Sequence, residues 1–278
     1  MRQEKPNMLT FPNAKINIGL NITEKRPDGF HNIESVFYPI PLCDALEALP
    51  SHTLTFSQSG MEIAGNKESN LVFRAFELIR PRIKDQMLAK VHLHKVIPMG
   101  AGLGGGSADG AFALKLFNSI FQLNLSQKEM EEMAAELGSD CPFFIANKPV
   151  FCYDRGIKFK PIELELEGWY IVLVNPNIHI STAEAYAAIT PKIAPHNLLE
   201  SIKRPVEEWK GLIQNDFEEA LREKYPILGK IKETLYTKGA TYSAMTGSGS
   251  TVYGLFREKI AAESLFPDFS TWQFPLPQ

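Results

Sequence analysis

Alternating hydrophobic and polar positions predict several strands in this chain. Apolar residues occupy every second position from 14 to 22, which places Lys15 and Asn17 together on the opposite side of one strand with one buried face. The sequence RPDG at 26–29 is a turn signal, and SVFYPI at 35–40 follows it as a partner strand, so we expect a hairpin. The segment VHLHKVI at 91–97 alternates again and ends at Pro98.

Helical spacing and end signals predict helices between these strands. The segment NLVFRAFELI at 70–79 has helical spacing, and residues 108–121 form a largely apolar helical stretch. The next helix opens with a capping box of Ser126 and Glu129 and ends at Gly138. Ser181 and Glu184 form another such box before residues 183–189. The segment SDCPFFIA at 139–146 reads only as a short connection.

The second half of the chain repeats this mixture of strands and helices. We expect a second hairpin at 150–163, a buried strand at 169–174, and a glycine turn, MTGSGS at 245–250, that leads into a strand at 251–256. Mixed elements in both halves suggest two α/β sandwiches. The polar hairpin end near 155–165 is the weakest point for a boundary, so the expected domains are 1–160 and 161–278.

Composition narrows the class of protein. A hydrophobic content of 44% and a charged content of 22% are typical of a soluble globular protein. A net charge of -3 and a pI near 6.1 argue against a general nucleic-acid or membrane-surface binder. The first 22 residues have no continuous apolar core, and no apolar run is long enough to cross a bilayer. The three cysteines lack CxxC spacing, which fits a reducing compartment, so we expect a cytoplasmic protein.

The segment PMGAGLGGGSADG at 98–110 is the strongest candidate for chemistry. Five of the eight residues from Met99 to Gly106 are glycine, and the order strand, glycine loop, helix suits phosphate binding by backbone N–H groups. The loop lacks the GK[ST] of a Walker A motif and the second strand of a dinucleotide site. Ser107 can offer its hydroxyl to a phosphate or a magnesium ion, or simply cap the helix. We expect Gly104 and Gly105 to leave room for phosphates in a loop outside the core, although a merely flexible turn stays open.

Six stretches of the sequence carry a resemblance to one family. The segment PMGAGLGGGSAD resembles the central motif of the GHMP kinases, and MTGSGS resembles their third motif. The segments NAKINIGLNI, PDGFHNIESVF, LGSDCPFF and NDFEEAL, which begin at residues 13, 27, 137 and 215, resemble one branch of that family. The resemblance implies an α/β (α+β) two-domain GHMP kinase fold, each domain a layered α/β sandwich, with the active site in the cleft between them.

The same resemblance implies a reaction and a catalytic pair. The expected reaction is ATP-dependent phosphorylation of the 2-hydroxyl of 4-diphosphocytidyl-2-C-methyl-D-erythritol in the non-mevalonate isoprenoid pathway, with ATP and Mg²⁺. The family's catalytic lysine and aspartate fall on Lys15 and Asp140. A carboxylate can accept the hydroxyl proton, and a lysine beside it keeps it ionised. From the residues alone, Lys15 could be a solvated strand lysine and Asp140 a helix cap before Pro142.

Binding residues also follow from the resemblance. It assigns His31 to the cytosine edge, Phe30 and Tyr186 to a sandwich around the base, and Asn17 and Thr182 to the sugar-phosphate part of the substrate. Core packing stays the alternative for the two aromatic residues. The nucleotide site implied by the resemblance comprises Asn70, Leu71 and Lys95 near the adenine, and Pro98, Met99, Gly100, Ala101, Gly102, Leu103, Gly104, Gly105, Gly106, Ser107 and Ala108 near the phosphates.

Other candidates are weaker. His92 and His94 share one strand face, but a third ligand at suitable spacing is absent, so a solvated sheet face is the simpler interpretation and the metal ligands stay unknown. No residue arrangement recommends Cys141 as a nucleophile. Gly110 departs from the alanine that is more common in the family, which predicts a looser helix.

Two rival functions remain. One is another GHMP kinase that acts on a small alcohol or a mevalonate-type acid, and the other is a non-catalytic nucleotide-binding or RNA-binding protein on the same fold. The partner we expect is a small molecule, with no nucleic acid or membrane, and the chain is expected to be a monomer or a weak homodimer.

Overall fold

The computed structural model describes residues 8–63 and 67–276, which form two compact units. The first unit draws on the segments Met1–Ala14, Leu42–Met99 and Gly104–Lys148, and the second on Lys15–Pro41, Gly100–Leu103 and Pro149–Gln278. Each unit therefore combines segments that are distant in sequence. The sequence boundary near residue 160 stays a prediction. Among the described residues, every helix is too short or too polar to cross a bilayer.

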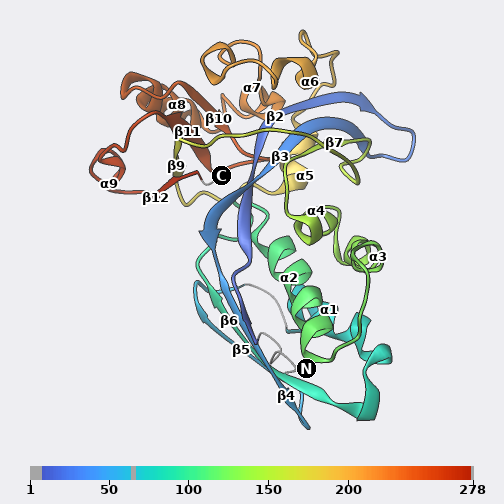
Figure 1. Cartoon of the computed structure of the whole chain (residues 1–278). Coiled ribbons are helices and arrows are strands. Elements are labelled where there is room, and N and C mark those ends of the chain that lie inside the picture. Colours follow the sequence, from blue (N-terminus) through green and yellow to red (C-terminus); the bar gives the residue numbers. More distant parts are fainter. Residues whose placement is uncertain (1–7, 64–66, 277–278) are drawn as a thin grey trace. The chain divides into compact units, whose positions relative to one another are not determined.

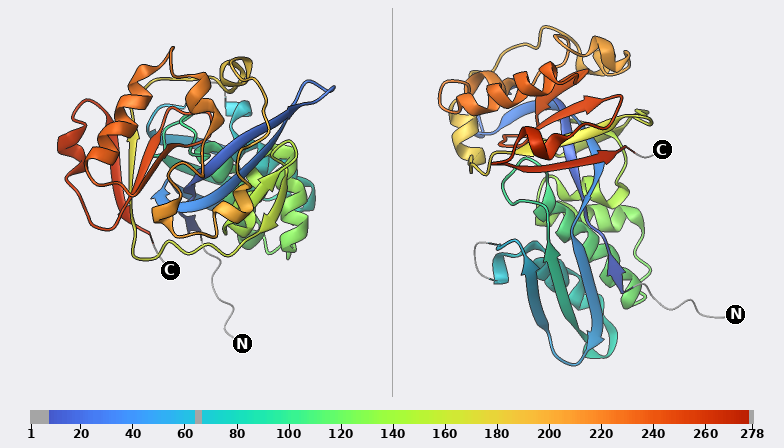
Figure 2. Two further views of the ribbon diagram at one scale, coloured as in Figure 1. Left: turned by 90° about the horizontal axis from the view of Figure 1, so that it is seen from above. Right: turned by 90° about the vertical axis from the view of Figure 1, so that its left-hand side faces the viewer.

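The first unit is a four-stranded sheet with helices on one face. The strands β1 (Leu9–Thr10), β4 (Ala45–Ser51), β6 (Leu88–Lys95) and β5 (Thr55–Gly60) lie in that order, and only the β5–β6 pair is parallel. The helices α1 (Leu71–Ile79), α2 (Gly105–Ile120), α3 (Gln127–Leu137) and α4 (Cys141–Ala146) lie on one side of this sheet (Figures 1 and 2). Three short 3₁₀ helices flank α1 in the chain, Lys67–Ser69 before it and Arg80–Arg82 and Lys84–Gln86 after it.

The second unit contains two antiparallel sheets. One has the order β2 (Asn13–Lys25), β3 (His31–Cys43), β7 (Val150–Tyr153), β8 (Lys158–Pro161). The other has the order β10 (Tyr242–Met245), β11 (Val252–Phe256), β9 (Tyr170–Asn175), β12 (Ser270–Pro275), and α8 (Pro226–Thr237) covers one of its faces (Figure 2). The remaining helices are α5 (Thr182–Ala187), α6 (Leu198–Ser201), the 3₁₀ helix Val206–Glu208, α7 (Asp216–Ala220) and α9 (Ala262–Leu265).

The expected hairpins and the capping box of Ser126 and Glu129 are confirmed in the structure. Both expected hairpins form, and the β7–β8 turn uses left-handed backbone at Asp154 and Gly156, with φ of 61° and 80°. Ser126 and Glu129 form the complete capping box of α3, which ends at Gly138. These features depend on a few neighbouring residues, so the sequence carries enough information to predict them.

The expectation that one face of the first strand is exposed is wrong. Every residue of β2 from 13 to 22 is buried, on both faces. Lys15 is only 4% exposed, because its side of the strand is covered by other segments of the second unit, among them the residues that follow β10. The interpretation of Lys15 as a solvated strand lysine is therefore excluded.

Three local expectations about helices also change. Residues 141–146 form the helix α4, with Pro142 in its first turn, where its missing N–H costs nothing. The cap of α2 is Gly104, so Ser107 is inside the helix and is not its cap. A Cβ on Gly110 would lie 2.9 Å from Leu71 Cβ, so the glycine allows α1 and α2 to pack closely and does not indicate a loose helix.

No disulfide joins any of the three cysteines, all of which lie among the described residues. Cys141 is buried in the first unit and Cys152 in the second, while Cys43 is half-buried in the first. The reducing compartment that their spacing suggested stays a prediction.

Candidate active site

The second half of the glycine loop forms the beginning of α2 in the first unit. Gly104 caps the helix in the left-handed conformation, with φ of 71°. A Cβ on Gly106 would lie 3.3 Å from Met99 Cε, the flexible end of a side chain, so there is little obstruction at this position. The first backbone N–H groups of a helix have no partner within it, and they form a ready site for a phosphate.

The expectation that this loop lies outside the core is wrong. Leu103 and Ala108 are fully buried. A Cβ on Gly105 would lie 2.7 Å from Ile97 Cγ2 and 3.0 Å from Lys95 Nζ. A valine at Gly105 would therefore disturb the packing of α2 as well as any phosphate site.

The first half of the loop lies in the second unit, against the MTGSGS turn. A Cβ on Gly102 would lie 2.1 Å from the Thr246 carbonyl oxygen, and Thr246 Oγ1 donates to the Gly102 carbonyl at 2.9 Å. The Thr251 amide donates to Ala101 O at 3.3 Å, and the Lys15 amide donates to Leu103 O at 2.9 Å. Residues 100–103 are thus held by both the MTGSGS turn and β2.

The MTGSGS turn is itself anchored by a buried amide. Asn215 Nδ2 donates to the carbonyls of Met245 and Gly247 at 2.8 and 2.9 Å. Asn215 also caps α7 by accepting from the Phe217 amide at 3.0 Å. One side chain therefore fixes both the helix of the NDFEEAL segment and the turn that supports the glycine loop.

Lys15 and Asn17 form a buried polar group on β2. Lys15 Nζ donates to Asn17 Oδ1 and lies 4.5 Å from the centre of the Phe37 ring. The Asn17 side-chain Nδ2 donates to Ser35 Oγ at 2.8 Å, and the Asn17 backbone N–H donates to Thr246 Oγ1 at 2.9 Å. The bond to Ser35 fixes the direction of the Asn17 side-chain amide, and with it the oxygen that receives the Lys15 ammonium.

Asp140 occupies the position before α4 in the first unit. Its side chain does not cap the helix, although Asp140 is the residue at the N-cap position. The neighbouring Cys141 is buried, and burial raises the pKa of its thiol to about 12. Ser107 donates a hydrogen bond that opposes this rise without cancelling it. Cys141 is therefore a thiol at neutral pH, which agrees with its expected lack of a nucleophilic role.

The residues expected at the base lie in the second unit. The rings of His31 and Tyr186 are stacked, with centroids 5.0 Å apart and an interplanar angle of 27°. Tyr186 also makes an edge-to-face contact with the ring of Phe217. Phe30 is 56% exposed. Thr182 is exposed at the first position of α5, which Ser181 caps through the Glu184 amide. The interpretation of Phe30 as a core residue is thus excluded.

The environment of His31 sets its charge. Burial lowers the pKa of the imidazole, and the positive charge of Lys25 lowers it further. His31 is therefore neutral at neutral pH, with one ring nitrogen as a donor and the other as an acceptor.

Lys95 and Asn70 already have structural partners. The Lys95 ammonium donates to Asp44 at 2.5 Å and Asp109 at 2.7 Å, and the side chain is fully buried. Asn70 caps α1 by accepting from the Val72 amide at 2.9 Å. A contact between the Lys95 ammonium and adenine is thus not supported, although Leu71 begins α1 directly beside Asn70.

The histidines of β6 do not form a metal centre. His92 is hydrogen-bonded to Ser57 and Ser59, and His94 to Ser59, each at 2.9 Å. Within residues 8–63 and 67–276, no group of three potential ligands could hold a metal ion. The two imidazoles are therefore hydrogen-bonded to serine hydroxyls on the same face of the sheet.

Comparisons with known proteins identify the family. The model of the GHMP kinases N terminal domain matches residues 70–148, and that of the GHMP kinases C terminal matches residues 198–270. The 4-diphosphocytidyl-2-C-methyl-D-erythritol kinase of Bacteroides fragilis is 52% identical over 259 residues, 91% of this chain and 94% of that protein. The enzyme of the same name from Parabacteroides distasonis is 48% identical and covers 96% of this chain and 98% of its own. This chain belongs to the 4-diphosphocytidyl-2-C-methyl-D-erythritol kinase family.

Solved structures agree with this family. A crystal structure of a 4-(cytidine 5'-diphospho)-2C-methyl-D-erythritol kinase has a TM-score of 0.79 and 26% identity, and it covers 96% of this chain and 98% of its own. The mevalonate kinase of Methanococcus jannaschii has a TM-score of 0.69 at 15% identity, which shows the fold alone. The expected GHMP kinase fold is confirmed, and the chain is an ATP-dependent kinase of the 4-diphosphocytidyl-2-C-methyl-D-erythritol kinase family.

Several residues that contact the candidate residues within each unit were not anticipated from the sequence. Their roles depend on contacts between distant segments, so no local pattern marks them. They are Ser35, Asp44, Asp109, Arg155, Asn215 and Thr246. Ser35, Asp109, Asn215 and Thr246 do lie within the motifs that carry the family resemblance, and this was the available signal for those four.

Proposed function

We propose that this chain transfers the γ-phosphoryl group of ATP to the 2-hydroxyl of 4-diphosphocytidyl-2-C-methyl-D-erythritol. The observation that carries the proposal is that relatives 44–53% identical over 90–97% of the chain bear the name of that kinase. Exposed Phe30 and the neighbouring His31–Tyr186 stack support it, because a mevalonate-type substrate has no base to stack on aromatic rings. Another GHMP kinase activity or a non-catalytic role is therefore not favoured.

In this proposal, Asp140 accepts the proton of the reacting hydroxyl. A positioned general base typically contributes about 10²–10⁴ in rate. Lys15 supplies positive charge that keeps the carboxylate ionised and stabilises the moving phosphoryl group. The buried chain of Asn17, Ser35 and Thr246 supports this role, because it restricts the position of the lysine ammonium.

The nucleotide would be ATP with Mg²⁺. Phosphoryl transfer depends mainly on positioning and on neutralising charge, and the metal ion supplies much of that neutralisation. The first turn of α2 and residues 100–106 would receive the phosphates through backbone N–H groups. Asn17 and Thr182 would bind the sugar-phosphate part, while Phe30, His31 and Tyr186 would bind the cytosine. We place this activity in the cytoplasm.

A coupled ADP-release assay tests the proposal. The purified chain should turn over 4-diphosphocytidyl-2-C-methyl-D-erythritol and show no useful rate with mevalonate or with methylerythritol phosphate, which lacks the cytidine. Asp140→Asn keeps the shape but removes the proton acceptor, so kcat should fall by roughly two to four orders of magnitude while both KM values change little.

The matched control is Asp85→Asn, an exposed aspartate in the same unit. Asparagine tolerates the left-handed backbone of Asp85, with φ of 57°, so this variant should keep full activity. Equal rates with and without the cytidine would reject the substrate. An Asp140→Asn rate above about a tenth of the wild-type rate, with chemistry limiting, would reject the assigned base.

A further inference from the structure

Phe30 is an exposed aromatic ring on a rigid backbone. It follows the β2–β3 turn, where the Arg26 amide donates to Phe30 O at 2.8 Å and the Phe30 amide donates to Asp28 Oδ1 at 3.1 Å. Gly29 closes the turn with a φ of 85° and donates its amide to Arg26 O at 3.1 Å. Both backbone polar groups of Phe30 are therefore hydrogen-bonded within the turn, and the backbone position from which its side chain projects is fixed.

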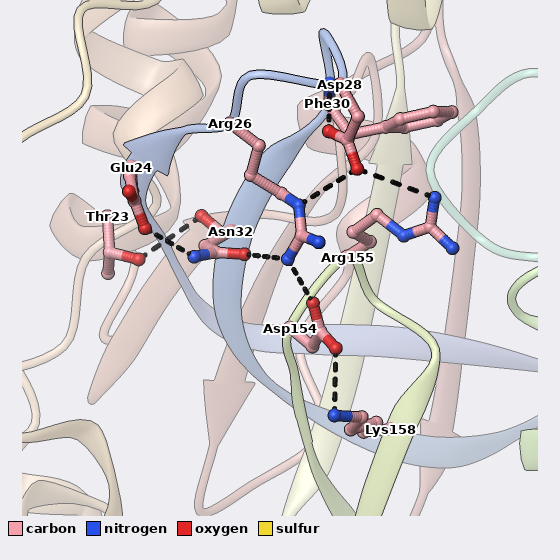
Figure 3. Close-up of polar contacts among 9 residues, drawn as sticks. All are labelled: Thr23, Glu24, Arg26, Asp28, Phe30, Asn32, Asp154, Arg155 and Lys158. Carbon is pink, nitrogen blue, oxygen red and sulfur yellow. Dashed lines mark hydrogen bonds and ion pairs between the residues drawn. The ribbon is translucent and has the colours of Figure 1, made fainter.

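A charged network joins this turn to the β7–β8 turn (Figure 3). Arg26 lies at its centre, because its guanidinium donates to Asp28 Oδ2 at 3.2 Å, to Asn32 Oδ1 at 2.9 Å and to Asp154 Oδ1 at 2.6 Å. The Ile33 amide adds a backbone bond to Asp154 O at 2.7 Å. The two turns thus hold each other in register within the second unit.

Arg155 follows Asp154 and reaches back over Phe30. Its guanidinium carbon lies 4.9 Å from the centre of the Phe30 ring, and its Nη1 lies 3.9 Å from Asp28 Oδ2 (Figure 3). The 4.9 Å between the guanidinium carbon and the ring centre is within the range of a cation–π contact. Phe30 remains 56% exposed with Arg155 in place, so a second planar group still has access to the ring.

We propose that Arg155 is a positioning residue for substrate specificity: it covers one face of Phe30 and presents the other face to the cytosine. This inference rests on the proposed function, in which Phe30 stacks on the base. A ring that is held before binding loses less freedom when the base arrives, so pre-organisation raises affinity without a direct contact between Arg155 and the base.

The variants Arg155→Met and Arg155→Lys test this role. Methionine keeps an unbranched stem but removes the charge, and it should raise the KM for the cytidine substrate about two- to fivefold, the factor that corresponds to an exposed cation–π contact. The inhibition constant of CDP, used as a probe of the base site, should rise by the same factor. The KM for ATP should stay unchanged, and Arg155→Lys should recover most of the loss.

Lys158→Met is the matched control. Lys158 belongs to the same hairpin and pairs with Asp154 at 3.1 Å, so its loss also weakens the turn network (Figure 3). Among the described residues, the cation that lies over the Phe30 ring belongs to Arg155 and not to Lys158, so this variant should keep the wild-type KM for both substrates. An equal effect of the two methionine variants would mean that only the general stability of the turn matters, and would overturn the proposal.

A double-mutant cycle separates positioning from other roles. In a Phe30→Ala background, Arg155→Met should have no further effect on the KM or on CDP inhibition, because the ring that it positions is absent. A full additional loss there, or a silent Arg155→Met in the wild-type background, would overturn the inference alone. If the wild-type chain failed to use the cytidine substrate, the proposed function would fall, and this inference with it.

Discussion

At the scale of single residues, the cluster of Lys95, Asp44 and Asp109 places three ionisable groups out of contact with water. Lys95 lies between two carboxylates, and Asp44 Oδ1 also accepts from the amides of Val96 and Ile97 at 2.5 and 2.8 Å. Asp109 Oδ1 is buried and has no partner among the described residues. A neutral carboxyl suits that position better than a second anion, because an unpaired buried charge costs much more than an unpaired neutral group.

The stability of the protein should therefore depend on the charge of Asp109. Burial raises the pKa of this carboxyl to about 8, and the negative charge of Asp44 adds to the rise while the Lys95 ammonium opposes it. Between the ordinary value of 3.8 and about 8, the folded protein holds a proton that the unfolded chain has released. The free energy of unfolding should then fall as pH rises through this window, by up to ~1.4 kcal/mol per pH unit from this group.

Asp109→Asn tests this dependence, because its amide is neutral at every pH. Urea unfolding from pH 5 to pH 9 should show the wild type losing stability relative to the variant as pH rises, whereas the exposed Asp85→Asn should run parallel to the wild type. Parallel curves for Asp109→Asn and the wild type would mean that Asp109 is ionised throughout, and that Lys95 outweighs the effects of burial and of Asp44.

At the scale of elements, α1 and α2 pack closely because the residue of α2 that faces the start of α1 is a glycine, Gly110. A Cβ on Gly110 would lie 2.9 Å from Leu71 Cβ and 3.4 Å from Leu137 Cδ1. The first atom belongs to the stiff base of a side chain, so it cannot give way without a shift of α1. The close approach also keeps Asn70 and Leu71, at the start of α1, near the helix that carries the glycine loop.

Gly110→Ala should therefore destabilise the protein, although alanine favours a helix. Overpacking typically costs about 1–3 kcal/mol, against a gain of about 1 kcal/mol in helix propensity. Gly229 in α8 provides the matched control, because it is exposed, has ordinary helical backbone, and a Cβ there would contact nothing within 4 Å. Gly229→Ala should stabilise the protein by about 0.4–1 kcal/mol in urea unfolding. Two substitutions with the same sign would contradict the packing argument.

At the scale of the whole molecule, the features that the sequence predicted well are those that depend on residues close together in the chain. The α3 capping box, the turn at Asp154 and the strand at 169–174 each depend on a short stretch of chain, and each is present. The helix α4 was missed because CPFFIA is too short to show helical spacing, although proline at its start was a usable signal.

Predictions that depended on distant segments were less successful. The alternation in β2 is real, but it could not show that the side bearing Lys15 and Asn17 is buried, because Thr246 is far away in sequence. The burial of Lys95 between Asp44 and Asp109 was hidden for the same reason. The family resemblance supplied the candidate site residues, but it gave no information on Arg155, whose contact with Phe30 follows from the hairpin geometry.

The two buried cysteines give the molecule an internal reporter in each unit. Cys141 and Cys152 are both inaccessible in the folded state, and they belong to different units. A thiol reagent can modify either one only when its surroundings open, so labelling rates measure the local opening of each unit separately. Mass spectrometry of the two labelled peptides, with ATP or the cytidine compound present, would then reveal which unit each ligand protects. The experiment uses the wild-type sequence and needs no engineered reporter.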